Sequence, residues 1–351
     1  DVCSSDLSFF KSTDEFVKHF PSLHFHNETI LLKGARVFEF EEIGHLLEQK
    51  THQTVLEINL NAVTHNLKAY QQLLNPGVKL MAMVKAFSYG SGSFEIANLL
   101  QHAGVDYLAV AYADEGVELR KAGIRLPIMV MNTAEAAFDS LLQYKLEPEL
   151  YSFQILQSFL AHCRKQQIHR YPVHIKLDTG MHRLGFVLAD MPELLTALGQ
   201  QDTLQLQSVF SHLAGSDDPQ LDYFTQEQAR SFEHMCAEIE SVVHYPFIRH
   251  IANTSAIHRH PDLQLNMVRL GIGLYGVDRR LNLENVTTLK TTISQIKQVK
   301  AGESVGYSRK GIVHRDTTVA TVRIGYADGY TRFFGNGKGK MLLNGVLVPV
   351  I

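Results

Sequence analysis

From Val55 onward the chain alternates short apolar runs with longer stretches of helical periodicity, and this alternation restricts its fold more than any other feature. In the longer stretches, apolar residues recur at three- and four-residue spacing, as in helices with one buried face. Eight strands, each followed by a helical or turn segment, make a (β/α)8 barrel. The predicted strands are Leu80–Val84, Tyr107–Ala111, Ile128–Asn132, Glu147–Tyr151, Val173–Asp178, Gln207–His212, Phe247–Ala252 and Met267–Leu274.

An open, doubly wound sheet is the main alternative for such a chain. That fold usually carries a GxGxxG turn after an early strand, and no such turn follows an early strand here. We therefore predict an α/β fold with a TIM barrel over residues 51–282. The helices expected between its strands include Phe94–His102, Asp114–Lys121, Ala134–Tyr144 and Phe153–Lys165.

The residue pattern of the sequence changes after residue 282. The segments Thr287–Val299, Thr317–Ile324 and Met341–Ile351 are rich in Val, Ile and Thr, and turns such as Asn344-Gly345 lie between such runs. This pattern predicts a mostly β C-terminal domain over residues 283–351. Because the last strand-like run continues to the final residue, we expect this domain to be truncated, that is, incomplete at its C-terminus.

Composition narrows the classes of partner. A formal net charge of -3 without any Lys/Arg block argues against a nucleic-acid partner. No stretch approaches the roughly 18 apolar residues of a membrane span. The N-terminus also lacks the basic segment followed by an apolar run that is typical of a signal peptide. The three cysteines are far apart and lack metal-ligand spacing. We therefore expect a cytoplasmic protein with no membrane partner, no disulfide framework and no metal site.

Lys85 stands at the end of the first predicted barrel strand, and Gly90 and Gly92 come shortly after it. Desolvation of an ammonium group at the mouth of an apolar pocket favours the neutral amine, which is the nucleophile in Schiff-base chemistry. The structural alternative is a strand-end lysine whose ammonium group reaches back to water. The residue alone does not decide between the two.

Polar residues also end several other predicted strands, and this is where the catalytic groups of a parallel barrel lie. Taken singly, each has a structural explanation: Asp178 forms a turn, His212 is a hydrogen-bonded core histidine, and Arg269 belongs to an ion pair. A purely structural barrel needs none of them. The whole set is Lys85, Tyr89, Lys176, Asp178, Arg183, His212, Ser216, Asn253, Thr254, Ser255, Arg269, Gly271 and Gly273.

Together with two later motifs, this set resembles bacterial alanine racemase, a fold-type III pyridoxal-phosphate enzyme. The resemblance extends from about Val55 to Ile351. It implies a barrel followed by a β domain, a homodimer, and an isomerase that interconverts L- and D-alanine to supply D-alanine for peptidoglycan in the cell wall. The motifs, in chain order, are Val84–Gly90, His174–Gly185, Phe210–Ala214, His250–Ser255, Val268–Gly276, Val305–Tyr307 and Ile324–Gly329.

By this resemblance, Lys85 binds pyridoxal 5'-phosphate covalently and then acts as one catalytic base, and Tyr307 of a second chain is the other. Racemisation needs proton removal on one face of the substrate Cα and proton delivery on the other, so two groups are required. Because a phenol is a weak base, we expect cationic groups near Tyr307. The active site is then shared between the two chains of the dimer.

The resemblance implies roles for the remaining residues. Arg269 faces the pyridine nitrogen, and because a guanidinium only donates hydrogen bonds, we expect that nitrogen to stay unprotonated. The implied substrate-binding residues are Arg183, Lys176 and Tyr326, and the family lysine at position 176 is often carbamylated. His182 departs from the glycine of one common form of the motif. The other implied cofactor-binding residues are Tyr89, His212, Asn253, Thr254, Gly271 and Ile272.

Residues 1–50 differ in pattern from the rest of the chain. A short apolar strand and a glycine turn are predicted over Thr29–Arg36, and an amphipathic helix over Phe40–Gln49. One such unit is too small to fold alone. It resembles the end of the C-terminal domain of the Mur ligases that add D-Ala-D-Ala to UDP-N-acetylmuramoyl-tripeptide. This implies a remnant of a bifunctional ligase and racemase fusion.

Three other functions are compatible with these residues. A racemase of another small amino acid, such as serine, would carry the same motifs, and a substrate panel would distinguish it. A non-catalytic pyridoxal-phosphate carrier would need neither the β domain nor Tyr307. A fragment that serves only as a scaffold for the ligase would hold no cofactor on Lys85.

Overall fold

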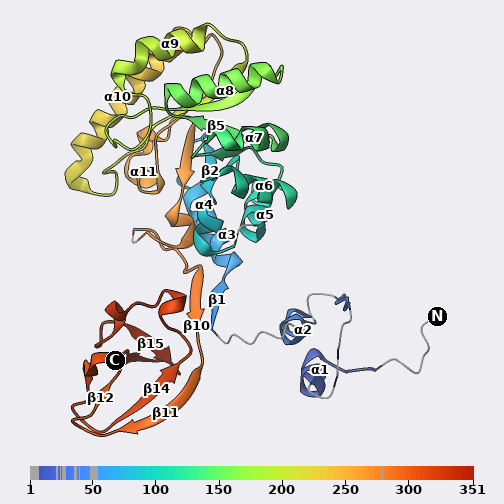
Figure 1. The fold of residues 1–351 in the computed structure, drawn as a ribbon, viewed down its shortest axis with the longest axis vertical. Coiled ribbons are helices and arrows are strands. Elements are labelled where there is room, and N and C mark those ends of the chain that lie inside the picture. The colour runs from blue at the N-terminus through green and yellow to red at the C-terminus, as the bar shows by residue number, and fades with distance from the viewer. Residues whose placement is uncertain are drawn as a thin grey trace. The chain divides into compact units, whose positions relative to one another are not determined.

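The computed structural model describes residues 8–20, 23, 25, 29–34, 38, 40–47, 54–92, 94–278 and 280–351. The chain forms two compact units, one of residues Ile58–Thr288 and one that combines Asp1–Glu57 with Leu289–Ile351. Figure 1 shows the first unit as a sheet surrounded by helices, and the C-terminal segment as a group of strands. Within the described residues, no helix is long and apolar enough to cross a bilayer.

The larger unit is a barrel of eight parallel strands, in the order β8-β7-β6-β5-β4-β3-β2-β9. The two strands at the ends of this order meet through backbone hydrogen bonds: the Arg269 N–H donates to the Ala252 carbonyl at 3.0 Å, and the Asn266 N–H to the Arg249 carbonyl at 3.1 Å. The barrel prediction is confirmed. The strands are β2 Lys79–Met83, β3 Tyr107–Val110, β4 Ile128–Val130, β5 Glu147–Leu150, β6 Tyr171–Lys176, β7 Leu204–Phe210, β8 Ile248–His250 and β9 Met267–Leu270.

The helices of this unit lie between the strands in sequence. Polar caps begin several of them: the Asn59 side chain accepts the Ala62 N–H at 3.1 Å at the start of α3. Two predicted elements need correction. The helix expected over 134–144 begins as a 3-10 turn, η4 (Glu135–Ala137), and the strand expected to reach Leu274 ends at Leu270, because Gly271 turns the backbone into η8 (Ile272–Tyr275). The helices are α3 Leu60–Gln71, α4 Lys85–Gly90, α5 Phe94–His102, α6 Ala113–Lys121, α7 Phe138–Tyr144, α8 Phe153–Lys165, α9 Met191–Gly199, α10 Asp222–Glu240 and α11 Thr254–Arg259.

The interior of the barrel is divided between apolar and polar side chains. Alternate residues of a strand point to the same face, so every second residue of each strand faces inward. On the side of β2, β3 and β4 the interior is apolar, with Met81, Met83, Tyr107, Ala109 and Met129 in one buried cluster. On the side of β5 to β9 it is largely polar. The buried polar residues there are Glu149, His174, Lys176, Ser208, His250 and Arg269.

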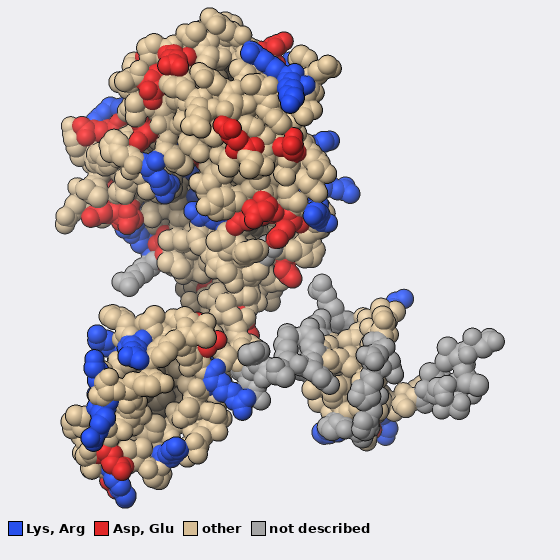
Figure 2. Space-filling model, in the orientation of Figure 1, with Lys and Arg blue, Asp and Glu red and all other residues tan. Residues whose placement is uncertain are grey.

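The C-terminal segment is mostly β, as predicted. β11 (Ile293–Val299) pairs antiparallel with β14 (Thr317–Val322), and β12 (Ser304–Val305) with β13 (Gly311–Ile312). β15 (Lys340–Leu343) and β16 (Val346–Pro349) form a hairpin across Asn344 and Gly345, whose positive φ angles of 48° and 81° match a two-residue turn. Lys and Arg predominate on the face of this segment seen in Figure 2. β1 (Val55–Ile58) pairs with β10 (Thr287–Lys290).

The N-terminal segment contains α1 (Thr13–His19), which the sequence pattern did not predict, and α2 (Phe40–Leu47), which it did. The strand predicted over Thr29–Arg36 is wrong for its described part, because residues 29–34 have no regular secondary structure. Isolated from a sheet, a short apolar run has no partner for its backbone N–H groups. Ala35 and Arg36, like Cys3 and the end of the predicted helix at 48–49, lie outside the described residues.

Candidate active site

Lys85 begins a left-handed turn at the C-terminal end of β2. The next residues, Ala86 to Tyr89, all have φ between 51° and 57°. This conformation costs an L-residue roughly 1–2 kcal/mol, so the surrounding structure must impose it. Strained backbone of this kind gathers at functional sites. The Lys85 side chain is partly exposed, and its Nζ lies 6.0 Å from the centroid of the Tyr89 ring.

Glu115, on α6, holds this turn to the neighbouring strand. Its Oε1 accepts the Ala86 N–H at 2.7 Å, while its Oε2 accepts the N–H groups of Ala111 at 2.6 Å and Tyr112 at 3.3 Å. One carboxylate therefore connects the Lys85 turn with the end of β3. The Ser88 N–H also donates to the Val84 carbonyl at 3.0 Å.

A pair of hydroxyl groups faces the turn after β9. A Cβ placed on Gly271 would lie 3.4 Å from the Tyr89 hydroxyl and 3.5 Å from Thr254 Oγ1, so any side chain at Gly271 would fill this space. Thr254 Oγ1 accepts the Gly271 N–H at 2.9 Å, which leaves its own hydrogen free to donate. Ile272 comes next, at the start of η8. Four of the predicted cofactor-binding residues, Tyr89, Thr254, Gly271 and Ile272, therefore come together, although they belong to three separate segments.

Arg269 is buried at the centre of the polar half of the barrel. Its Nη1 donates to His250 Nδ1 at 2.8 Å and to the His250 carbonyl at 3.2 Å. Its Nη2 donates to the carbonyl groups of Ser211 at 2.6 Å and Ile251 at 3.1 Å, and lies 3.4 Å from His212 Nδ1. Within the described ranges no hydrogen bond uses its Nε–H, so this donor is left for a ligand.

His212 is held as a neutral ring. Burial, reinforced by the positive charges of Arg269, Lys176, Arg183 and Lys85, lowers the pKa of His212 to about 2. A neutral His212 can accept a hydrogen bond from Arg269 through Nδ1. Its interpretation as a hydrogen-bonded core histidine is thus compatible with the cofactor-binding role that the resemblance implies.

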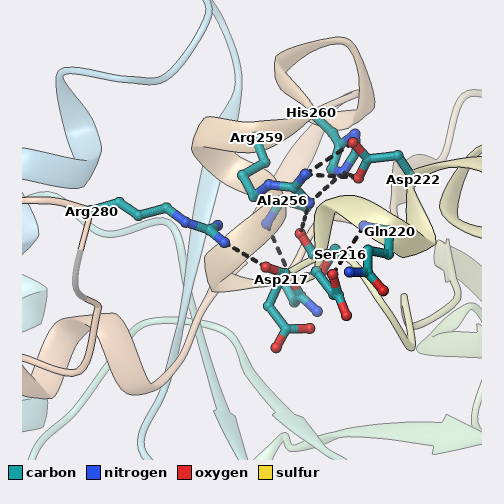
Figure 3. Close-up of polar contacts among 10 residues, drawn as sticks. Ser216, Asp217, Gln220, Asp222, Ala256, Arg259, His260 and Arg280 are labelled. Atoms are coloured by element: carbon teal, nitrogen blue, oxygen red, sulfur yellow. Dashed lines mark hydrogen bonds and ion pairs between the residues drawn. The ribbon is translucent and has the colours of Figure 1, made fainter.

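Asn253 lies close to this group and begins α11. Its Oδ1 accepts the Ala256 N–H at 3.2 Å and the Ser216 hydroxyl at 2.8 Å. Figure 3 shows how Arg259 of the same helix lies between the Ser216 loop and Asp222: its Nη1 donates to the Ser216 carbonyl at 2.6 Å and its Nη2 to both Asp222 oxygens. These contacts fix the loop after β7 against the helix that carries Thr254.

Four cations surround one buried carboxylate in this region. Burial raises the pKa of Glu149 to about 7, although Lys176, Arg269, Arg183 and Lys85 all act to lower it. Burial also lowers the pKa of Lys176 to about 8, and its Nζ lies 4.3 Å from the centroid of the Phe210 ring. Glu149 Oε2 has no hydrogen-bond partner in the described structure. The excess of positive charge suits an anionic ligand.

The loop after β6 carries Arg183 and is shaped by Asp178. Asp178 Oδ1 accepts the N–H groups of Gly180, Met181 and His182 at 3.0–3.1 Å, so its interpretation as a turn former is confirmed. His182 adopts φ 53°, which glycine would adopt without strain. Arg183 is exposed at the mouth of the barrel, in electrostatic reach of Glu149 and Lys176.

Tyr307 and Tyr326 belong to the other compact unit. Both are exposed, and both rings contact Arg332, whose guanidinium carbon lies 5.3 Å from the Tyr307 centroid and 5.2 Å from the Tyr326 centroid. Arg332 Nε also donates to the Tyr326 hydroxyl at 2.7 Å. A cation therefore lies beside the Tyr307 ring, as expected from the sequence.

Sequence reasoning missed four residues of this region: Glu115, Glu149, His250 and Arg332. Glu149 and His250 were detectable, because each is a polar residue inside a predicted apolar strand, where a side chain needs a specific partner. Glu115 and Arg332 gave no local signal. In the described part of the chain, no three His, Cys, Asp or Glu side chains gather as metal ligands.

Comparisons with known proteins agree with this architecture. Residues 58–279 match the family model for the N-terminal domain of alanine racemase, and residues 286–351 match that for its C-terminal domain. The chain is 35% identical over 304 residues to alanine racemase 1 of Clostridium acetobutylicum, covering 84% of this chain and 78% of that protein. It is 33% identical over 310 residues to the alanine racemase of Methanococcus maripaludis, covering 86% and 82%.

Solved structures give the same result. An alanine racemase of Clostridium difficile 630 superposes with a TM-score of 0.79 at 36% identity, covering 86% of this chain and 80% of that one. An alanine racemase of Bartonella henselae with covalently bound pyridoxal phosphate superposes with a TM-score of 0.77 at 27% identity, covering 85% and 82%. An alanine racemase of Bacillus anthracis with bound L-Ala-P superposes with a TM-score of 0.78 at 28% identity, covering 85% and 78%.

Proposed function

Because the chain belongs to the alanine racemase family, we propose that it interconverts L- and D-alanine with pyridoxal 5'-phosphate as its cofactor. The observation that carries the proposal is the convergence of Lys85, Arg269 and the hydroxyl groups of Tyr89 and Thr254 at one end of a parallel barrel. Such ends are where βα loops build phosphate and catalytic sites. A racemase of serine would use the same residues, and assays with both amino acids distinguish the two.

The residues present fit this cofactor. The opening beside Gly271 offers the hydroxyl groups of Tyr89 and Thr254 and the N–H of Ile272 to a phosphate, while the Gly271 N–H holds Thr254 in place. The buried excess of positive charge favours the anionic groups of the cofactor. The free Nε–H of Arg269 is assigned to the pyridine nitrogen. His212 and Asn253 line the remaining wall. When bound, pyridoxal phosphate withdraws electrons from an amino-acid substrate and so makes its Cα proton acidic.

Two groups of this protein then move the proton. Lys85 would hold the cofactor through its amine, and once freed by the substrate that amine would take or return the proton on one face of the substrate Cα. Tyr307 of the partner chain does the same on the other face, with Arg332 of its own unit beside its ring. This assignment requires a homodimer with shared active sites.

The substrate carboxylate is assigned to Arg183, which is exposed at the mouth of the barrel. Lys176 and Glu149 are buried and lie within electrostatic reach of Arg183. Tyr326, paired with Arg332, is assigned to the entrance, where it favours a small substrate. The relatives crystallised with L-Ala-P and with cycloserine support an amino-acid-sized ligand.

The domain organisation belongs to the same proposal: a cofactor-binding barrel over 51–282, a β domain over 283–351, and a ligase remnant over 1–50. The family matches at 58–279 and 286–351 support the first two. The third rests on the motif in residues 29–49, of which α2 forms and the predicted strand does not form over the described residues 29–34. A cytoplasmic enzyme that supplies D-alanine to peptidoglycan would suit a fusion to a cell-wall ligase.

Two experiments test these assignments. The purified protein with pyridoxal phosphate is offered L-alanine, D-alanine and both serine enantiomers, and we expect racemisation of alanine. In parallel, borohydride reduction followed by peptide mass analysis is expected to find the cofactor on the Lys85 peptide, and a Lys85→Ala variant to lack it. A wild-type protein that binds cofactor on Lys85 but racemises none of these amino acids would contradict the function and support a carrier. Absence of the adduct would contradict both.

The ligase remnant has its own test. The complete gene is sequenced upstream of residue 1, and the product is assayed for ATP-dependent addition of D-Ala-D-Ala to UDP-N-acetylmuramoyl-tripeptide. An upstream ATP-binding domain with this activity is expected. An upstream sequence without such a domain would overturn the proposed fusion.

A further inference from the structure

One hydrogen-bonded chain of side chains crosses the polar half of the barrel. It begins at Arg269 on β9 and ends at Glu147 on β5, with one residue from each strand between them. Arg269 Nη1 lies 2.8 Å from His250 Nδ1, and His250 Nε2 lies 2.9 Å from Ser208 Oγ. Ser208 Oγ lies 2.6 Å from His174 Nδ1, and His174 Nε2 lies 2.9 Å from Glu147 Oε2.

The two end residues, Arg269 and Glu147, determine the direction of every hydrogen bond between these side chains. A guanidinium can only donate, so His250 Nδ1 accepts and its proton is on Nε2. That proton goes to Ser208 Oγ, and the Ser208 hydroxyl then donates to His174 Nδ1. His174 therefore carries its proton on Nε2 and donates it to the Glu147 carboxylate, which can only accept.

Burial supports this single arrangement. His174, Ser208 and His250 are fully buried, so an unpaired atom in any of them would carry the cost of desolvation without compensation. Burial, followed by the charge of Arg269, lowers the pKa of His250 well below its ordinary value. A proton added to His174 would make its Nδ1 a donor and leave the Ser208 hydrogen without an acceptor.

We propose that Glu147, His174, Ser208 and His250 form a directional relay that positions Arg269, so that its Nε–H, rather than Nη1, faces the cofactor ring. The assignment rests on the proposed function for the last step only. None of these four residues needs to touch the cofactor, and they are positioning residues. Tyr107 contributes a weaker bond, its hydroxyl lying 3.3 Å from Glu147 Oε2.

The first test detects the relay without using activity. The holoenzyme is labelled with 15N-histidine, and the nitrogen shifts of His174 and His250 are assigned with the variants His174→Gln and His250→Gln. Both rings are expected to be neutral with the proton on Nε2. A Nδ1–H ring at either position, or a charged His174, would overturn the relay. This result is independent of whether alanine is racemised.

The second test separates the relay from a simple charge effect at Glu147. Glu147→Gln keeps an oxygen that accepts from His174, whereas Glu147→Leu removes it. We expect Glu147→Leu and Ser208→Ala to lower kcat about tenfold with KM changed by less than about twofold, as for residues that orient a ligand-binding group, and Glu147→Gln to stay within about twofold of wild type. Equal losses in Glu147→Gln and Glu147→Leu would show that charge matters and would overturn the relay.

A matched control measures the general effect of removing a buried hydroxyl group. Thr225 on α10 is fully buried, and its Oγ1 has no hydrogen-bond partner within the described structure. Thr225→Val is expected to leave kcat and both histidine tautomers unchanged. If wild type shows the expected tautomers but no racemisation, the relay stands and the proposed function fails. If Ser208→Ala keeps the wild-type kcat and tautomers, the relay fails alone.

Discussion

At the scale of single residues, Glu149 is the least expected feature of the site. It is a carboxylate with 2% exposure among cations, and one of its oxygens has no hydrogen bond within the described structure. Its raised pKa means that burial outweighs the attraction of Lys176 and the arginines. An anionic ligand that neutralises these cations would weaken their stabilisation of the ionised Glu149 carboxylate.

This raised pKa leads to a pH dependence with a definite sign. An unfolded Glu149 titrates near 4.5 and the folded one near 7, so the native state binds the additional proton between these values. Stability contributed by Glu149 is therefore lost as pH rises from about 5 to 8. Chemical denaturation at several pH values measures the free energy of unfolding of wild type and of Glu149→Gln. We expect the wild-type value to fall relative to that of the variant, by up to a few kcal/mol over this pH range. A rising difference would contradict the assignment.

His182 offers a residue-scale prediction on backbone strain. It occupies φ 53°, and its side chain is largely exposed, with Nδ1 3.3 Å from Asp178 Oδ2. His182→Gly removes the strain of the left-handed backbone but also raises the conformational entropy of the unfolded chain. We therefore expect the folded state to be stabilised by only about 0.5–1 kcal/mol. Thermal unfolding measures this change in stability. Gly180→Ala is the control in the opposite direction, because it places a side chain at a residue with φ 127° and is expected to destabilise the protein. A destabilised His182→Gly would mean that the contact with Asp178 outweighs the strain.

At the scale of elements, the left-handed turn after β2 depends on α6. Glu115 accepts three backbone N–H groups with two oxygens, and a glutamine has only one acceptor oxygen. Glu115→Gln is expected to cost about 1–3 kcal/mol and to weaken cofactor binding, because the Lys85 turn loses its anchor. Denaturation and cofactor titration measure the two effects.

Glu118 on the same helix provides the control for this change. It is exposed, and no hydrogen bond or ion pair involves its side chain within the described residues. Glu118→Gln is expected to change neither stability nor cofactor affinity measurably. Equal effects of the two substitutions would contradict the anchoring role of Glu115.

At the scale of the whole molecule, the proposed reaction needs residues from both compact units. Lys85 belongs to the barrel, and Tyr307 lies beside Arg332 in the other unit. In a symmetric dimer, each proposed site takes Lys85 from one chain and Tyr307 from its partner. This arrangement can be tested by mixing two inactive proteins.

Co-expression of Lys85→Ala and Tyr307→Phe chains is expected to restore racemisation. In a mixed dimer, one site carries both substitutions and the other carries none, so random pairing regenerates about a quarter of the native sites. Each variant purified alone is the control, and light scattering measures the mass of the mixture. Activity no higher than that of the separate variants would contradict a shared site.

Much of this protein was determined by sequence patterns that act locally. Eight apolar runs with helical spacing between them predicted the eight strands, because period-two and period-3.6 burial are properties of the chain itself. The polar residues at the strand ends likewise agreed with the rule that a parallel barrel gathers its loops at one face. The roles of Lys85, Arg269 and Tyr307 stay predictions until cofactor labelling and the mixed-dimer assay test them.

Only the tertiary structure decided how these residues are held. The strand predicted at residues 29–36 did not form over 29–34, because a short apolar run becomes a strand only when another segment pairs with it. Glu115 is 29 residues from the turn that it anchors, and the bonds that join Arg269 to Glu147 cross five strands. Such contacts depend on distances in space between residues far apart in sequence, and no local periodicity encodes them.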